Sequence, residues 1–266
     1  MEAQVDRDEA IPKLLEEHGG MVFSLGRRMC HSTEEAEDLV QETFLQAYRS
    51  WSQFEGRSTV KTWLYTIAMR TCQRLQRKRV GQPSRMSSLE SLLPMGEATM
   101  GVLDTEADSP LDMQMRMEGK QQIEEAIVEL PVEFRVPLIL KDILGFSIKE
   151  VAEITEIKVA TVKTRVHRAR LRLRQAMESI LPRAEVPPAE YPMQVCMDLL
   201  RLKQDSIDRG DDANSKLDNL VCRRCNILFT TMDYTYDACQ ELLEGRMPSE
   251  LRDRMLMHFQ NETNHN

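Results

Sequence analysis

The sequence predicts an all-α protein, and three observations support this prediction. Apolar residues recur at the helical period in several separate stretches. Ser147 followed by Glu150 is a capping-box pattern, which marks the start of a short helix. A longer helix follows it and carries one narrow apolar stripe, made of Val162, Val166, Ala169 and Leu173. We therefore expect two helical domains joined by a flexible linker, followed by a small helical module that contains cysteines.

The first expected domain is residues 1–80. Residues 8–29 form an amphipathic pattern with apolar anchors at Leu14, Leu15, Val22 and Leu25. Thr33 is expected to cap the next helix, whose first turns are acidic, as the helix dipole favours. A third helix should run from Lys61 to Arg79, after the polar loop Gln53–Thr59.

The next stretch, residues 81–117, is rich in Ser, Gly, Met and acidic residues and is broken by several prolines. This composition is typical of a flexible linker. Residues 118–182 form the second expected domain, in which two helices within 118–145 support the pair that begins at Ser147. A proline-rich spacer, Pro182–Pro192, then leads into the C-terminal module, residues 183–266.

Residues 147–174 read as a helix–turn–helix with a break at Thr155–Lys158. No acidic residue lies between Lys158 and Arg174, so the second helix is basic outside its apolar stripe. Such a helix suits a DNA groove, where basic side chains neutralise phosphates and a few reach base edges. An ordinary surface helix with a solvated basic face is the alternative. The candidate DNA contacts are Thr161, Lys163, Thr164, Arg165, His167 and Arg168.

The stretch from about Ile123 to Met177, which includes SIKEVAEITEIKVATVKTRVHRARLRLR, resembles region 4 of the extracytoplasmic-function sigma factors of bacterial RNA polymerase. The resemblance implies that the second helix reads the upstream −35 promoter element. One position departs from the family pattern, because Lys158 stands where a serine often caps that helix. A serine cap is worth about 0.5–2 kcal/mol.

The segment AEDLVQETFLQAYRSWSQFEGRSTVKTWLYTIAMR resembles region 2 of the same family. This resemblance implies that Asp38, Gln41 and Glu42 help to dock on the polymerase; a solvated acidic helix face is the alternative. It also implies that the loop near Gly56 and the following helix melt the −10 element, which requires a surface for an extruded base and basic charge for the exposed strand. The residues expected to supply these are Phe54, Arg57, Ser58, Lys61, Arg70, Arg74 and Arg77. Val60 and Thr71 depart from the family's usual Phe and Asn.

The 266-residue chain has a formal net charge of −8 and no apolar run long enough to cross a membrane. It opens without a signal-peptide pattern, so we expect a cytoplasmic protein. A locally basic but globally acidic protein binds DNA weakly by itself. This charge distribution favours a subunit of a larger assembly, with core RNA polymerase and promoter DNA as partners.

Four of the six cysteines lie in the last third of the chain. Cys222 and Cys225 form a CxxC spacing that lets two thiolates share one zinc ion, with Cys196 upstream. The arrangement resembles the zinc-binding anti-sigma domain, although Asp218 stands where that pattern has a histidine. The fourth ligand is left open among Asp218, Cys239 and His258, and a helical module with free thiols and no metal is the alternative.

The sequence therefore predicts a sigma factor that directs RNA polymerase to promoters and is regulated by its own C-terminal module. The chain shows no nucleotide-binding or nucleophile motif of an enzyme. A free-standing helix–turn–helix regulator is the alternative, although such a protein has no use for a polymerase-docking helix. The tail could inhibit or activate, could act as a redox or metal sensor, or could recruit a further regulatory protein.

Overall fold

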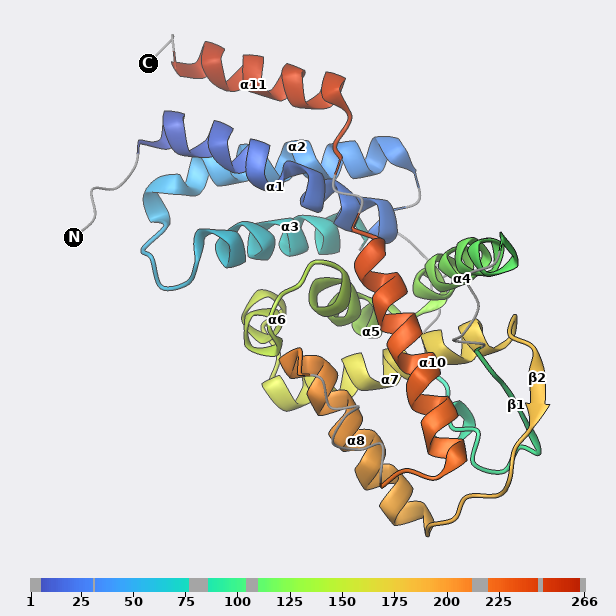
Figure 1. Ribbon diagram of the computed structural model, residues 1–266. Coiled ribbons are helices and arrows are strands. Elements are labelled where there is room, and N and C mark those ends of the chain that lie inside the picture. Colours follow the sequence, from blue (N-terminus) through green and yellow to red (C-terminus); the bar gives the residue numbers. More distant parts are fainter. Residues whose placement is uncertain are drawn as a thin grey trace. The chain divides into compact units, whose positions relative to one another are not determined.

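The structure is a computed structural model, and it describes residues 6–30, 32–76, 86–103, 110–211, 220–243 and 246–263. The chain divides into two compact units. Unit 1 comprises Met1–Gln82, Lys149–Lys158 and Leu243–Asn266, and unit 2 comprises Pro83–Ile148 and Val159–Leu242. Both units are built from helices, which confirms the predicted all-α class (Figure 1).

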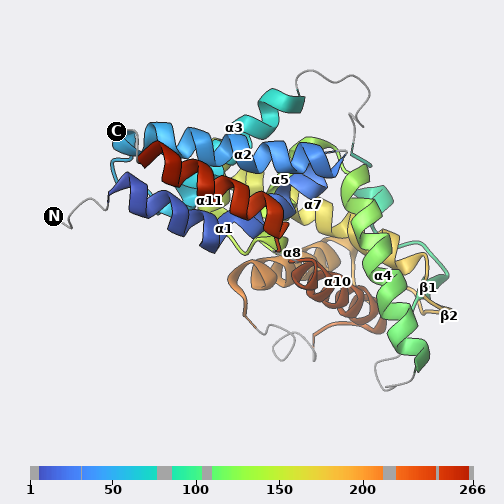
Figure 2. The ribbon, with the colours of Figure 1, turned by 90° about the horizontal axis from the view of Figure 1, so that it is seen from above.

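Unit 1 is organised around three helices, α1 (Arg7–Met29), α2 (Thr33–Ser50) and α3 (Val60–Gln76), with the 3-10 turn η1 (Trp51–Gln53) after α2. Most of α6 (Ile148–Thr155) and all of α11 (Ser249–Thr263) also belong to it. Figures 1 and 2 show α11 alongside α1 and α2. The interior is apolar and includes Ile11, Val22, Leu25, Leu39, Phe44 and Leu64.

The start of α2 differs from the prediction, because its N-cap is Ser32 and not Thr33. The Ser32 hydroxyl accepts a hydrogen bond from the backbone N–H of Glu35 at 3.2 Å. Ser32 has an extended backbone, which an N-cap requires, whereas Thr33 is already helical. Close by, α1 and α2 approach so closely that a Cβ at Gly26 would lie 3.0 Å from Ala36, so glycine suits this position.

Unit 2 holds α4 (Pro110–Glu129), α5 (Val132–Leu138), the π-helical turn η3 (Ile139–Ile143) and α7 (Val159–Glu178), followed by α8 (Met193–Arg209) and α10 (Arg223–Glu241). Helix α5 begins directly after Pro131, whose fixed φ suits a helix start. Figure 1 shows α10 crossing α7, and α10 also packs on α4, η3 and α8.

The prediction of a flexible linker over residues 81–117 is corrected for the part of this segment that the structure describes. The 3-10 turn η2 (Glu90–Leu92) and the strand β1 (Thr99–Gly101) lie within it, and α4 already begins at Pro110. Strand β1 pairs antiparallel with β2 (Arg183–Glu185) in the register Met100↔Ala184. Tertiary contacts order this segment: Leu92 and Met100 are buried in a core cluster, and backbone pairing satisfies the polar groups that a linker would leave to water.

Residues 183–266 are predicted to form a separate module, and the structure differs from this prediction as well. Helices α8 and α10 share one apolar core with η2, β1 and α7, in which Leu171, Leu200, Leu228 and Phe229 are buried. Helix α11 belongs to unit 1 instead. The amphipathic faces of the tail helices are therefore buried against the other elements of each unit. No helix in the described part of the chain has the length and apolar character that a membrane crossing requires.

Candidate nucleic-acid interface

Helix α7 is the predicted DNA-reading helix, and its local sequence explains its orientation. Val162, Val166, Ala169 and Leu173 are fully buried, as the predicted stripe requires. Helices α4, α5 and α10 pack against α7 within unit 2. The other faces of α7 carry the predicted DNA contacts, and the four basic ones each have a partner in the same unit.

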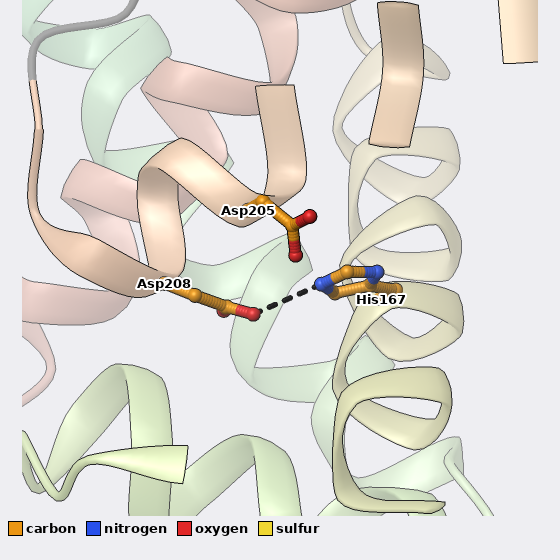
Figure 3. A group of neighbouring side chains, drawn as sticks. All are labelled: His167, Asp205 and Asp208. Atoms are coloured by element: carbon orange, nitrogen blue, oxygen red, sulfur yellow. Dashed lines mark hydrogen bonds and ion pairs between the residues drawn. The ribbon is translucent and has the colours of Figure 1, made fainter. Parts of the chain in front are cut away.

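Two of these side chains, Lys163 and His167, pair with residues of α8. The Nζ atom of Lys163 lies 2.9 Å from Oδ1 of Asp205. The Nε2 atom of His167 lies 3.0 Å from Oδ2 of Asp208, as the dashed line in Figure 3 shows. Residues three or four apart on a helix share a face, so each helix presents two of these charged groups to the other. The sequence did not predict this pairing.

Arg170 lies one turn beyond His167 and two turns beyond Lys163, and it is buried. Its Nε and Nη2 atoms donate to the two carboxylate oxygens of Asp142 at 2.8 and 2.7 Å, and its Nη1 atom lies 2.8 Å from Oδ1 of Asp208. Burial acts to lower the pKa of the Arg170 guanidinium, but the two carboxylates outweigh burial and raise it. Burial acts to raise the pKa of the Asp208 carboxyl, but His167 and Arg170 outweigh burial and lower it. Both groups are therefore charged at neutral pH.

Arg165 and Arg168 have partners on other elements of unit 2. Arg165 Nη2 lies 3.0 Å from Oε2 of Glu133. Arg168 Nη2 donates to the backbone carbonyl of Ser87, and the guanidinium carbon lies 5.4 Å from the centroid of the Phe134 ring. A guanidinium over an aromatic face is attracted by the ring quadrupole.

The two predicted threonine contacts lie nearer to solvent. Thr164 is exposed, and its hydroxyl donates to the Ala160 carbonyl one turn earlier at 3.0 Å. Thr161 is half-buried. The structure therefore places all six predicted residues on α7 and gives the basic ones intramolecular partners.

The loop expected to melt the −10 element contains Phe54. Its ring lies 5.8 Å from that of Trp51 and 5.3 Å from that of Trp63, as centroid distances. Trp51 is buried, whereas Phe54 and Trp63 are half-buried. Phe54 thus forms the outer part of an aromatic cluster, with part of its surface open to solvent.

The polar residues of the same loop are nearer to solvent. Arg57 is exposed, and its Nε atom lies 3.0 Å from Oε2 of Glu55. The Ser58 hydroxyl donates to the Thr59 carbonyl at 3.3 Å. Lys61 is half-buried at the start of α3. All four predicted residues, Phe54 among them, therefore lie in the loop or in the first turn after it.

Two basic residues of α3 have acidic partners within unit 1. Arg70 Nη2 lies 2.6 Å from Oε1 of Glu156, and Arg74 Nη2 lies 2.8 Å from Oε1 of Glu42. These side chains are largely exposed, and such pairs contribute little to stability. Arg77 lies outside the described residues.

The predicted docking residues lie on α2. Asp38 is exposed, and Glu42 is half-buried beside Arg74. Gln41 lines a small hollow together with Leu45 and four residues of α11, which are Arg254, Met255, His258 and Phe259. The C-terminal helix therefore borders one edge of the predicted docking face.

The three predicted zinc ligands all lie in the core of unit 2. Cys196, Cys222 and Cys225 are buried and belong to one apolar cluster. Burial raises the pKa of the Cys225 thiol, and the neighbouring sulfurs of Cys222 and Cys196 raise it further. Burial acts to raise the pKa of the Cys222 thiol, but hydrogen bonds from the backbone, Glu190 among them, outweigh burial and lower it. The structure thus places Cys196 in the same buried cluster as the Cys222–Cys225 pair, which begins 26 positions later in the sequence.

The three candidates for a fourth ligand are placed differently. Asp218 lies outside the described residues. Cys239 is buried on α10, fourteen positions after Cys225. His258 belongs to unit 1, where its ring lies 5.8 Å from that of Phe259.

The acidic partners of α7 are the functional feature that sequence reasoning missed. Asp205 and Asp208 are three residues apart on an amphipathic helix, a pattern too common to reveal a partner. With His167 they form the one group of three metal-ligating side chains found in the described residues, their ligand atoms lying within 4.8 Å of one another. Lys163 and Arg170 already neutralise the two carboxylates, so the group is explained as a network of ion pairs.

Comparison with known proteins identifies the family to which the chain is similar. The model of sigma-70 region 2 matches residues 14–81, and the model of sigma-70 region 4 matches residues 120–173. The ECF RNA polymerase sigma factor SigW of Bacillus subtilis is 31% identical over 173 residues, covering 65% of this chain and 91% of that protein. The RNA polymerase sigma-H factor of Pseudomonas aeruginosa is 31% identical over 163 residues, covering 61% of this chain and 83% of that one.

Among solved structures, sigma factor RpoE of Bartonella quintana, in complex with the anti-sigma factor NepR, is similar over 62% of this chain and 94% of that one, with 25% identity and a TM-score of 0.45. The matched regions of the chain include the loop before α3, α2 with its predicted docking residues, and most of α7. These two sequence relatives are matched over 91% and 83% of their own length. The chain therefore belongs to the ECF family of RNA polymerase sigma factors.

Proposed function

We propose that this chain directs RNA polymerase to promoters through α7, which reads the −35 element, and through the loop before α3, which melts the −10 element. The observation that carries the proposal is the presence of both sigma regions in one chain. A free-standing regulator needs only the helix–turn–helix. On this proposal the chain acts in the cytoplasm with core polymerase, which supplies the catalysis.

The chemistry of the two surfaces supports this division of roles. Arg165 and Arg168 lie in the N-terminal half of α7, the part that enters a major groove, and guanidinium groups pair with guanine edges there. Phe54 and Arg57 offer an aromatic face and a positive charge, which an unpaired strand requires. Neither surface alone would account for a promoter-opening protein.

Replacing Phe54, Arg57 and Ser58 together by alanine is expected to leave polymerase binding intact and to impair promoter opening. Loss of one stacked base contact costs about 1–3 kcal/mol, so open complexes should fall by roughly 5- to 150-fold. Transcription with core polymerase first identifies a promoter that the intact protein uses. Permanganate footprinting of unpaired thymines on that promoter then measures opening by the variant.

The matched control is Ser52→Ala/Gln53→Ala, which changes two exposed residues just before Phe54. It should open promoters as the intact protein does. Normal opening by the triple variant would place the melting surface elsewhere, and reduced polymerase binding would instead indicate that the loop supports unit 1.

We also propose that Cys196, Cys222 and Cys225 hold a zinc ion. Three thiols within one buried cluster fit the preference of zinc for thiolate ligands. When bound, zinc would supply the positive charge that keeps these sulfurs deprotonated in an apolar surrounding. Cys239 lies fourteen residues after Cys225 on the same helix, about 21 Å along its axis, so it cannot share the ion, and the fourth ligand stays open between Asp218 and His258.

Protein purified under reducing conditions is expected to contain about one zinc per chain, as a single site of this kind binds. Cys222→Ser/Cys225→Ser should remove the metal and lower the unfolding temperature, since a structural zinc site contributes folding free energy. Cys30→Ser, which changes a half-buried thiol in unit 1, is the control. Equal metal content in both variants, measured by atomic emission, would refute the site.

A further inference from the structure

We infer, on the basis of the promoter-binding role proposed for α7, that α8 is a built-in competitor of duplex DNA, with Asp205 and Asp208 in the place of DNA phosphates. The C-terminal extension would then hold α7 in a form that does not engage the promoter. Both helices belong to unit 2.

The first support is the identity of the paired groups. Lys163 and His167 are predicted DNA contacts, and their nitrogen atoms lie 2.9 and 3.0 Å from carboxylate oxygens of α8. A phosphate would bind the same donors at the same distances. While α8 is in place, these side chains cannot neutralise DNA phosphates, and the counterion release that drives DNA binding is lost.

The second support is steric. Gln204 Nε2 donates to the backbone carbonyl of His167 at 3.2 Å, and Arg170 Nη1 donates to the carbonyl of Gln204 at 3.4 Å. The two helices are therefore in direct contact, without space for a sugar-phosphate strand between them. A major groove about 12 Å wide accepts one helix, which is about 10–12 Å across with its side chains. A helix pair joined along this face does not enter it.

The third support is the way in which α8 is held. Leu199, Leu200 and Ile207 are buried in the core cluster, and Lys203 Nζ lies 2.5 Å from Oδ1 of Asp233 on α10. The covalent connection gives α8 an effective concentration that reaches the millimolar range. DNA and α8 would thus compete for the same face of α7. By thermodynamic reciprocity, α8 weakens DNA binding by the same free energy by which bound DNA weakens the contact between α8 and α7.

The test uses the full chain with substitutions at two acidic positions of α8. Asp205 faces Lys163, whereas the polar partners of Asp198 within the described residues are Arg201 and Gln194, both on α8 itself. Asp205→Lys and Asp198→Lys change the net charge equally, but only the first places a cation against Lys163. Asp205→Ala and Asp198→Ala repeat the comparison without an added positive charge.

Two measurements are made on each variant. Acetylation of Lys163 by an amine-reactive reagent, followed by mass spectrometry, reports whether α8 leaves α7. Fluorescence anisotropy with a labelled random-sequence duplex reports DNA affinity. Loss and reversal of a half-exposed ion pair should increase both the labelling rate and the affinity of the Asp205→Lys protein by about three- to tenfold over Asp198→Lys. Asp205→Ala should show a smaller increase in the same direction.

Three results would overturn the inference. Equal labelling of Lys163 in the Asp205 and Asp198 variants would mean that this ion pair does not hold α8. Greater labelling without tighter DNA binding would mean that α8 does not compete with DNA. An affinity gain in Asp205→Lys that Asp205→Ala lacks entirely would reflect the added charge alone.

Failure of the proposed function gives a different result. All variants are also assayed with core polymerase on fragmented genomic DNA of the source organism, and transcript start sites are sequenced. Defined start sites from any variant support the sigma-factor role, whatever the outcome for α8. Absence of defined start sites from every variant, with Asp205→Lys included, would remove that role independently of the labelling result.

Discussion

Unit 2 of an Arg170→Met protein is expected to lose about 3–5 kcal/mol of its free energy of unfolding. Arg170 is 4% exposed and is the cationic partner of two buried carboxylates, Asp142 and Asp208. Methionine fills much of the volume but leaves both carboxylates without this positive charge. An unpaired buried charge costs several kcal/mol, which is the physical reason for the large effect.

Hydrogen exchange of the α7 and α10 amides under denaturant measures this loss within unit 2 alone. Arg172→Met is the matched control, because Arg172 is two residues away and its partner, Glu129, is largely exposed. That change should cost less than about 1 kcal/mol. A third protein, Arg170→Met/Asp142→Leu/Asp208→Leu, should recover most of the lost stability, since an apolar replacement of a buried charge cluster is often neutral. Equal stability of the two single variants would contradict the assigned role of Arg170.

An Arg224→Met protein is expected to lose about 3 kcal/mol of the stability of unit 2, through loss of hydrogen bonds to several carbonyls at once. Arg224 is 3% exposed. Its guanidinium donates to the carbonyl of Pro94 at 2.5 Å, of Glu97 at 2.7 Å and of Pro187 at 3.0 Å. These carbonyls belong to the segments next to β1 and β2, so Arg224 connects α10 to both sides of the small sheet.

Arg223→Met is the control, because the neighbouring Arg223 is exposed and should change stability by less than about 0.5 kcal/mol. The measurement is amide exchange of Thr99–Gly101 and Arg183–Glu185, together with chemical unfolding. Exchange in these strands should rise in Arg224→Met before α4 or α7 opens. Unchanged protection of the strands would show that backbone pairing and apolar packing hold the sheet without the arginine.

Much of the fold could be predicted from the sequence because its signals are local. The capping pattern at Ser147 is followed by α6 from Ile148, and the break near Thr155–Lys158 is followed by α7 from Val159. At Glu156, within that break, φ is +57°, which ends the helical run. The spacing of Val162, Val166 and Leu173 determined which face of α7 is buried, since a stripe at the helical period has one side that excludes water.

The linker prediction failed because composition describes what a segment would do without partners. Pro94, Gly96 and the serines around Leu89 indicate a chain that resists helix and strand. Leu92 and Met100 are nevertheless buried, and β1 finds its partner more than eighty residues later. A strand of three residues has too short a pattern to be detected, and its pairing depends on where the tail returns.

The sequence by itself determined which residues on α7 are basic, which helices carry the two sigma regions, and which cysteines are spaced for a shared metal. Only the tertiary structure decided that Lys163 and His167 face Asp205 and Asp208, and that Arg170 is buried between two carboxylates. A helical period fixes the direction in which a side chain points, because the backbone geometry is regular. The partner that it meets is fixed by how distant segments pack together. Lys163 and Asp205 are 42 positions apart in the sequence, so no local pattern records that choice.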